Sequence, residues 1–269
     1  MSYVFDLEKS ITTIKRFLAG KLGRSGLDGF VIGLSGGIDS ALSATLAVEA
    51  VGAEKVLGIL MPYRTSSESS VTDARELVAG LGITSREIDI SPMIDAYYDK
   101  ITDDIRLRAG NKMARERMSI LFDIAHETGR LVLGTGNRTE AALGYTTWYG
   151  DSACSLNPIG ELYKTEVRRM ARHLHVPEAI LTKAPSADLW TSQTDEGEIG
   201  VTYETIDIIL GKVLDEGIMS MAQLEAAGID PVDASRIIGM LNRNAFKRYV
   251  PDVAPLGRGP IPGDVDLDA

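Results

Sequence analysis

The 269-residue chain is long enough for one large α/β domain, and its 44% hydrophobic and 25% charged content is ordinary for a globular protein. The formal net charge of −10 argues against a nucleic-acid-binding surface. The single cysteine, Cys154, permits no internal disulfide, the first residues do not resemble a signal peptide, and no apolar run approaches the ~18 residues that span a membrane. We therefore expect a cytoplasmic protein with neither nucleic acid nor membrane as partner.

Strands and helices alternate through the first half of the chain. In chain order we expect a helix at 6–22, a strand at 30–34, a helix at 41–48, a strand at 55–61, a helix at 71–81, a strand at 84–90, a helix from Ser91, a long helical region at 103–128 and a strand at 131–133. This alternation predicts the α/β class: a doubly wound, mostly parallel sheet flanked by helices, with a ligand above the carboxyl ends of the strands.

The second half of the chain is rich in helices. We expect helices at 165–175, 202–216, 219–227 and 232–247, followed by an irregular tail at about 250–269. No linker separates independent units, so the interpretation is a single domain over residues 1–269.

A glycine-rich turn follows the first strand, where residues 33–40 read Gly-Leu-Ser-Gly-Gly-Ile-Asp-Ser. A strand, a glycine turn and a helix aim several backbone N–H groups at one point, which suits an anion such as phosphate. The pattern fits neither the Walker loop nor the dinucleotide fingerprint. The plainer interpretation is a tight turn, which would not need Ser35, Asp39 or Ser40. The stretch resembles the SGGxDS loop of enzymes that cleave ATP to AMP and pyrophosphate.

A second glycine turn follows the strand at 131–133 and reads Gly134-Thr135-Gly136. In a doubly wound sheet it would lie on the same rim as the first turn. Asp39 and Glu140 would then be two carboxylates that share a Mg²⁺ between phosphates. Taken alone, Glu140 could equally be a helix-capping carboxylate.

Further blocks extend the resemblance over roughly residues 10–251. They are Asn111-x-x-Ala-Arg115, the segment 134–140 (GTGNRTE), 144–151 (GYTTWYGD), 157–165 (NPIGELYKT), 185–190 (PSADLW), 193–196 (QTDE) and Lys247-Arg248. In this order they resemble an ammonia-dependent NAD synthetase. The resemblance implies ATP and Mg²⁺, small-molecule substrates and a homodimer. It implies that nicotinic acid adenine dinucleotide is adenylated on its carboxylate, that pyrophosphate leaves, and that ammonia displaces AMP to form NAD.

The resemblance also assigns site residues. Those expected to bind ATP are Gly33, Leu34, Ser35, Gly36, Gly37, Ile38, Asp39, Ser40, Thr135, Lys164 and Ser186. Asp39 and Glu140 would bind Mg²⁺ and, with Lys164, carry the catalysis. The substrate-binding positions are Arg115, Trp148, Asp151, Ser155, Phe246 and Lys247. Lys164 and Arg115 could instead be solvated helical charges.

Three positions of the part that holds the acceptor depart from the common family pattern. Trp148 stands where Lys is frequent, Ser155 where Asp is frequent and Phe246 where His is frequent. Trp148 and Phe246 could stack on an aromatic base, or each could be a core residue. The acceptor could therefore be nicotinate mononucleotide or another small carboxylate.

Two other functions remain open, a sulfur transferase with Cys154 as donor and a non-catalytic nucleotide sensor. The chain contains no recognisable glutaminase, so the ammonia would be free or come from a separate protein. The polar segment Ser186–Glu196 is expected to act as a lid over bound ATP.

Overall fold

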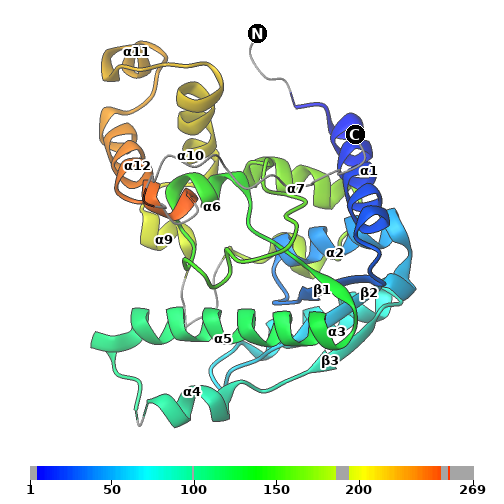
Figure 1. Cartoon of the computed structure of the whole chain (residues 1–269). Helices are drawn as coiled ribbons and strands as arrows, with labels where there is room; N and C mark the ends of the chain where they lie inside the picture. Colours follow the sequence, from blue (N-terminus) through cyan, green and yellow to red (C-terminus); the bar gives the residue numbers. More distant parts are fainter. Residues whose placement is uncertain (1–4, 99, 186–193, 250–253, 255–269) are drawn as a thin grey trace.

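The structure is a computed structural model that describes residues 5–98, 100–185, 194–249 and 254. The predicted tail at 250–269 lies, apart from residue 254, outside the described residues. Figure 1 shows the chain from its amino-terminal helix to the carboxyl-terminal helices.

The strands are β1 (Gly29–Gly33), β2 (Val56–Leu60), β3 (Thr84–Glu87) and β4 (Arg130–Leu133). The helices of the first half are α1 (Leu7–Ser25), α2 (Ile38–Val51), η1 (Ala53–Lys55), α3 (Glu68–Leu81), α4 (Ser91–Tyr97), η2 (Asp103–Ile105) and α5 (Arg106–Glu127). Those of the second half are α6 (Arg138–Leu143), α7 (Lys164–His173), α8 (Glu178–Thr182), α9 (Asp195–Ile199), α10 (Tyr203–Leu210), η3 (Gly211–Asp215), α11 (Met221–Ala226), α12 (Pro231–Arg243) and η4 (Ala245–Arg248).

The four described strands form one parallel sheet in the order β3-β2-β1-β4. Because β1 has β2 on one side and β4 on the other, the connections that leave β1 and β4 diverge at their carboxyl ends. This divergence opens the crevice in which doubly wound sheets bind their ligands. The predicted α/β class and doubly wound topology are confirmed.

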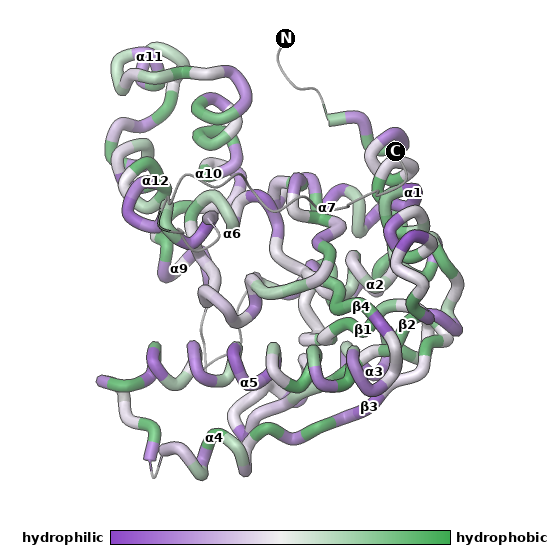
Figure 2. The backbone as a smooth tube through the Cα atoms, in the orientation of Figure 1, coloured by the Kyte–Doolittle hydropathy of each residue, from purple (hydrophilic) through white to green (hydrophobic). Residues whose placement is uncertain are grey.

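Helices cover both faces of the sheet because alternate side chains of β1 point to opposite sides. Phe30 and Ile32 are buried with residues of α1, α2, α3 and α7, whereas Val31 is buried with residues of α4 and α5. Figure 1 shows α5 and α4 on one side of the strands and α2 and α7 on the other. Figure 2 shows mostly hydrophobic residues along β1 and β4 and hydrophilic ones along β3, with α5 alternating between hydrophilic and hydrophobic residues. That alternation is the pattern of a helix with one buried face.

A separate apolar cluster holds the helices of the second half together. Its members come mainly from α6, α9, α10, α11 and α12, with Tyr203 as a fully buried side chain. Figure 1 shows these helices as a group beside the sheet layers, with α6 and α7 between the two. The predicted helix-rich second half is therefore correct.

Several predicted boundaries were wrong. The strand predicted at 84–90 ends at Glu87, because Asp89 accepts hydrogen bonds from the backbone N–H and hydroxyl of Ser91 and turns the chain into α4. By contrast, the helix predicted at 202–216 is confirmed over Tyr203–Asp215, of which Gly211–Asp215 form a π-helical turn. The helix predicted at 232–247 ends at Arg243 and continues as a 3₁₀ turn. Short helices α6, α8 and α9 were not predicted, because five or six residues are too few to show a helical period.

Within the described residues, no helix is both long and apolar enough to cross a membrane.

Candidate active site

A cleft of about 670 Å³ lies at the carboxyl ends of β1 and β4. All eight residues of the first glycine turn, Gly33–Ser40, line it. The lining also includes the second turn with Thr135 and Gly136, together with Glu140 and Lys164. The structure thus brings together the two turns that the sequence placed on one rim.

The first turn requires glycine at position 36. Gly36 has a φ of +75°, and a Cβ built there would lie 2.1 Å from the backbone oxygen of Ser70. A side chain at this position would therefore be strained by its φ and would collide with the first turn of α3, which contains Ser70. Ser70 also lines the cleft, so Gly36 sets how closely the glycine turn and α3 approach.

Serine hydroxyls brace the same turn. The Ser40 hydroxyl accepts from the backbone N–H of Ser35 at 3.3 Å and donates to the carbonyl of Gly37 at 3.0 Å. The Ser35 hydroxyl accepts from the backbone N–H of Gly37 at 3.2 Å. The amino-terminal end of α2 follows directly and has no side-chain cap. Its N–H groups and dipole therefore favour an anion in the cleft.

A buried lysine joins the two predicted metal-binding carboxylates. The Lys164 ammonium donates to Asp39 Oδ2 at 2.6 Å and to Glu140 Oε1 at 3.0 Å. The Lys164 side chain is 3% exposed, whereas those of Asp39 and Glu140 are 18% and 19% exposed. Lys164 is therefore not a solvated surface lysine. We call Gly33–Ser40, Gly134–Glu140 and Lys164 the phosphate half of the cleft.

The charges of this cluster depend on one another. Burial raises the pKa of Glu140 above its usual range, the Lys164 ammonium opposes that shift, and the nearby Asp39 charge adds to it. Burial alone would lower the pKa of Lys164, but the charges of Asp39 and Glu140 and the hydrogen bonds to them raise it above its usual range. Lys164 is therefore charged at neutral pH, and the two carboxylates are held together around it.

Asn137 connects the capping of α6 with the site. Its side-chain oxygen accepts from the Glu140 N–H at 2.9 Å, and Glu140 Oε2 accepts from the Asn137 N–H at 3.2 Å. This is a capping box, so Glu140 does cap a helix, as the plainer interpretation held. The Asn137 amide also donates to Asp39 Oδ1 at 2.9 Å. Glu140 is thus a cap and a cleft carboxylate at once.

Sequence reasoning missed further residues of the cleft wall. Lys183 pairs with Asp73 and donates to the Ser70 hydroxyl at 3.3 Å, which ties α3 to the segment after α8. Asp195 is buried, lines the cleft and accepts from the hydroxyl of Tyr203 at 3.0 Å. The contacts of Lys183 join residues more than 100 positions apart and lie outside the motifs, so the sequence did not indicate them. Asp195 did have a sequence indication, because it belongs to the QTDE block.

We call the segment Gly144–Ser155, together with Arg115, Phe246 and Lys247, the acceptor half, only part of which lines the cleft. Asp151 and Lys247 line the cleft. Asp151 accepts from the Thr147 N–H at 2.7 Å, and the Lys247 ammonium donates to the carbonyls of Gly144 and Thr146 at 2.8 Å each. Asp151 therefore stabilises the loop to which it belongs, and Lys247 stabilises the same loop by contacting it.

The other predicted substrate-binding residues lie near the cleft but not in its described lining. Arg115, on α5, donates to the carbonyl of Trp148 at 3.2 Å. The Trp148 ring stacks on Tyr149 with centroids 4.5 Å apart and meets Phe246 edge-on at 5.4 Å. Phe246 is 52% exposed, so this aromatic group lies at the surface rather than in the core.

Three further residues bear on the predictions. Ser155 accepts a hydrogen bond from the backbone N–H of Val132 at 3.1 Å, which anchors it to β4. Cys154 is partly buried, and burial raises the pKa of its thiol, which opposes the thiolate that sulfur transfer requires. Ser186 and residues 187–193 of the predicted lid lie outside the described residues.

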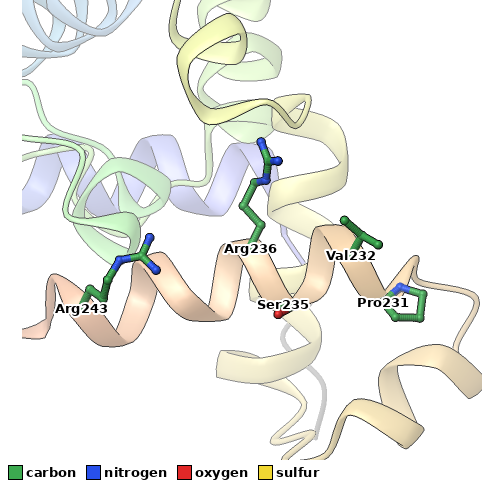
Figure 3. Close-up of a pocket in the computed structure, with 5 residues that line it drawn as sticks. All are labelled: Pro231, Val232, Ser235, Arg236 and Arg243. Atoms are coloured by element: carbon green, nitrogen blue, oxygen red, sulfur yellow. The ribbon is translucent and has the colours of Figure 1, made fainter.

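A second hollow lies on α12 and is shown in Figure 3. Its five lining residues are Pro231, Val232, Ser235, Arg236 and Arg243. Arg236 donates to the carbonyl of Ile199 at 3.1 Å and so serves the packing of α12 on α9. This hollow shares no lining residue with the cleft and presents neither a glycine turn nor a carboxylate, so it is not the phosphate site.

A doubly wound sheet, a serine-braced glycine turn and an Asp–Lys–Glu cluster at one cleft are the features of an α/β protein that binds a nucleotide. A sequence model of the family described as NAD synthase matches residues 10–251. An NH₃-dependent NAD⁺ synthetase of Pelodictyon phaeoclathratiforme is 46% identical over 248 residues, which cover 92% of this chain and 89% of the relative.

Two solved structures extend the comparison. The NH₃-dependent NAD synthetase from Campylobacter jejuni, in complex with the nitrate ion, is 34% identical with a TM-score of 0.78, covering 93% of this chain and 100% of that one. The NMN synthetase from Francisella tularensis is 35% identical with a TM-score of 0.79, covering 93% and 99%. The chain belongs to the NAD synthase family. The predicted family and enzyme class, a carbon–nitrogen ligase that uses ATP, are confirmed.

Proposed function

We propose that the protein amidates nicotinic acid adenine dinucleotide with ammonia and forms NAD through an acyl-adenylate. In this reaction the substrate carboxylate attacks the α-phosphorus of ATP and pyrophosphate leaves. Ammonia then attacks the acyl carbon and AMP leaves. The observation that carries the proposal is the Asp39–Lys164–Glu140 cluster, which joins the glycine turn to Glu140 and Lys164 in one cleft of a chain of the NAD synthase family.

The phosphate half has the groups that adenylation needs. Phosphoryl transfer depends mainly on positioning and on neutralising charge. The turn at Gly33–Ser40 and the free amino-terminal end of α2 offer backbone N–H donors for phosphate oxygens, and Lys164 supplies a fixed positive charge. Thr135 lines the same wall, and Ser186 remains an ATP contact by resemblance alone.

The carboxylates of Asp39 and Glu140 fit a Mg²⁺ ion. Magnesium is commonly held by one or two protein carboxylates together with substrate phosphates. Both carboxylates line the cleft and retain partial exposure, and each of their oxygens accepts one hydrogen bond, from Lys164 or from Asn137. When bound, the ion would neutralise the charge on the phosphates and on the departing pyrophosphate.

Nicotinate mononucleotide is a second candidate acceptor. The chain is 35% identical to a protein described as an NMN synthetase, and Trp148, Ser155 and Phe246 depart from the common family pattern. A mononucleotide lacks the adenosine half of the dinucleotide. The aromatic group of Trp148, Tyr149 and Phe246 would then have no second base on which to stack.

A two-substrate assay tests both candidates. Pyrophosphate release and amide formation are measured with ATP, ammonia and either carboxylate at equal concentrations. We expect amide with the dinucleotide at a higher kcat/KM than with the mononucleotide. A higher kcat/KM with the mononucleotide would mean that the mononucleotide is the acceptor. If neither carboxylate supports pyrophosphate release, the proposed function is refuted.

The proposal includes a homodimer, a cytoplasmic location and a lid at Ser186–Glu196, each by resemblance or from composition. Sedimentation at micromolar concentration tests the dimer. Shortening Ser192–Gly197 tests the lid, since loss of a cover should lower the amide formed per AMP released. An unchanged ratio would remove the lid from the account.

A further inference from the structure

Asp207 is a buried carboxylate outside the cleft that contacts both segments of the Lys164–Glu140 pair. It lies on α10 and is 8% exposed. Its Oδ1 accepts from the Thr139 hydroxyl at 2.6 Å, and its Oδ2 accepts from the backbone N–H of Thr165 at 2.8 Å. Thr139 precedes Glu140 and Thr165 follows Lys164, so one carboxylate joins the neighbours of two site residues.

The Thr139 hydroxyl completes this connection. It is fully buried, and while it donates to Asp207 it also accepts from the backbone N–H of Lys164 at 2.9 Å. The first two N–H groups of α7 are therefore held by one hydroxyl and one carboxylate. Without these partners they would be unsatisfied donors at a helix start. Lys164 and Glu140 therefore lie on two backbone segments that these hydrogen bonds hold to each other.

A second carboxylate, Asp215 at the end of η3, contacts the residues that precede Thr139 and Lys164 in the chain. Asp215 accepts from the Arg138 guanidinium at 2.7 Å and from the Tyr163 hydroxyl at 2.8 Å. In a regular α-helix, residues eight positions apart point about 80° away from each other. The π-helical turn Gly211–Asp215 accommodates one extra residue and brings Asp215 towards the face of Asp207. Figure 1 shows α6, α7 and α10 beside one another, and they are in contact.

We propose that Asp207 is a positioning residue, which through Thr139 and Thr165 holds Glu140 and Lys164 at the separation that adenylation requires. Asp215 supports the same two segments. This inference rests on the proposed function for the reaction concerned, but the geometry that it assigns can be measured without turnover. A displacement of about 1 Å at a reacting centre can lower a rate by about 10²-fold, so rigid support from outside the cleft affects catalysis.

The test uses variants that keep volume and change one hydrogen bond. Thr139→Val removes the hydroxyl, Thr139→Ser keeps it, and Asp207→Asn keeps the shape but loses one acceptor. Thr128→Val is the matched control, because the Thr128 hydroxyl donates to the Ile124 carbonyl at the end of α5, away from the cleft. We expect Thr139→Val and Asp207→Asn to lower kcat for pyrophosphate release by about 10- to 100-fold. The KM for ATP should change less than about threefold in both.

The controls separate positioning from general stability. Thr139→Ser should keep kcat within about threefold of the wild type, and Thr128→Val should lower Tm without lowering kcat. The double variant Thr139→Val/Asp207→Asn should be no slower than the slower single variant, since both act through one connection. Three results would each overturn the proposal. Thr139→Val could have the same kcat as Thr128→Val, or Thr139→Ser could lose as much kcat as Thr139→Val. The third result is a loss of kcat in the double variant that equals the product of the two single losses.

A binding measurement distinguishes failure of this inference from failure of the proposed function. Calorimetry with a non-hydrolysable ATP analogue, with and without Mg²⁺, needs no acceptor. The wild type should bind the analogue more tightly with Mg²⁺, and Asp207→Asn should lose most of that gain while its affinity without Mg²⁺ stays unchanged. If Mg²⁺ raises the affinity of Asp207→Asn for the analogue as much as it raises that of the wild type, the positioning role is overturned. If Mg²⁺ raises the affinity of the wild type but the enzyme amidates neither the dinucleotide nor the mononucleotide, only the proposed reaction fails.

Discussion

The two halves of the cleft are built differently. In the phosphate half, the functional side chains are buried or braced, and Lys164, Asp39, Glu140 and Asn137 each contact at least one other member of the group. In the acceptor half, Arg115 and Lys247 donate to backbone carbonyls of the loop, and Asp151 accepts from a backbone N–H of the same loop.

Of the two halves, only the acceptor half contains exposed aromatic side chains among the described residues. Tyr149 is 45% exposed and adopts a φ of +59°, an uncommon conformation for a side chain of its size. A braced cluster of charges suits a reaction that needs fixed geometry, as the proposed adenylation does. A surface loop held by its backbone can change its side chains without disturbing that chemistry. The three departures from the family pattern all fall in the acceptor half.

The largest effect should come from the carboxylates of the phosphate half. Asp39→Ala and Glu140→Gln should each lower pyrophosphate release by about 10²- to 10³-fold, because one metal ligand and one partner of Lys164 are lost together. The remaining carboxylate still pairs with Lys164, so circular dichroism should show the fold retained. Near wild-type release at limiting Mg²⁺ would show that these carboxylates do not hold the metal.

A smaller but still large effect is expected at the backbone of the same half. Gly36→Ala should raise the KM for ATP by about tenfold and lower Tm, because the added Cβ meets the Ser70 carbonyl at a positive φ. Gly80→Ala is the matched control: nothing lies within 4 Å of its Cβ position, on helix α3. Comparable losses in the two variants would contradict the close approach at Gly36.

Trp148→Ala should affect one substrate only. If the aromatic group stacks on the acceptor, the KM for the dinucleotide should rise by about tenfold while the KM for ATP and the Tm stay nearly unchanged. Phe246→Ala should act in the same direction, since the two rings are in contact. A lower Tm with parallel losses for both substrates would mean that Trp148 only packs against its neighbours.

The smallest effect is expected at Ser155. Its hydroxyl is engaged with the Val132 N–H, so Ser155→Ala should change the acceptor KM by less than about threefold. Steady-state kinetics with both acceptors measures this. A tenfold rise would show that the hydroxyl contacts the substrate and that the two halves meet more closely than the cleft lining indicates.

The phosphate half was largely predictable because its turns are local. A β-branched run, a glycine turn and a helix start within 11 residues specify Gly33–Ser40, and all eight of these residues line the cleft. The Lys164–Asp39 contact joins residues 125 positions apart, and only the family resemblance pointed to it. Asp207 was not predicted, although an acidic residue within the apolar run Ile206–Leu210 is a pattern that could have indicated it.

The acceptor half was less predictable for a physical reason. Whether Arg115 contacts a substrate or the Trp148 carbonyl depends on the conformation of a surface loop, which includes the positive φ of Tyr149. Residue types and spacing do not determine such a conformation. Asp151 and Lys247 do line the cleft, but both hydrogen-bond to the loop itself.

The central claim is that the phosphate half activates the acceptor carboxylate before ammonia takes part. Exchange of labelled pyrophosphate into ATP tests it most directly, because exchange reports reversible formation of the acyl-adenylate. The account predicts exchange that requires the carboxylate acceptor and Mg²⁺, proceeds without ammonia, and falls at least about 10²-fold in Glu140→Gln. Exchange that is unchanged when the acceptor is omitted, or that appears only when ammonia is added, would contradict it.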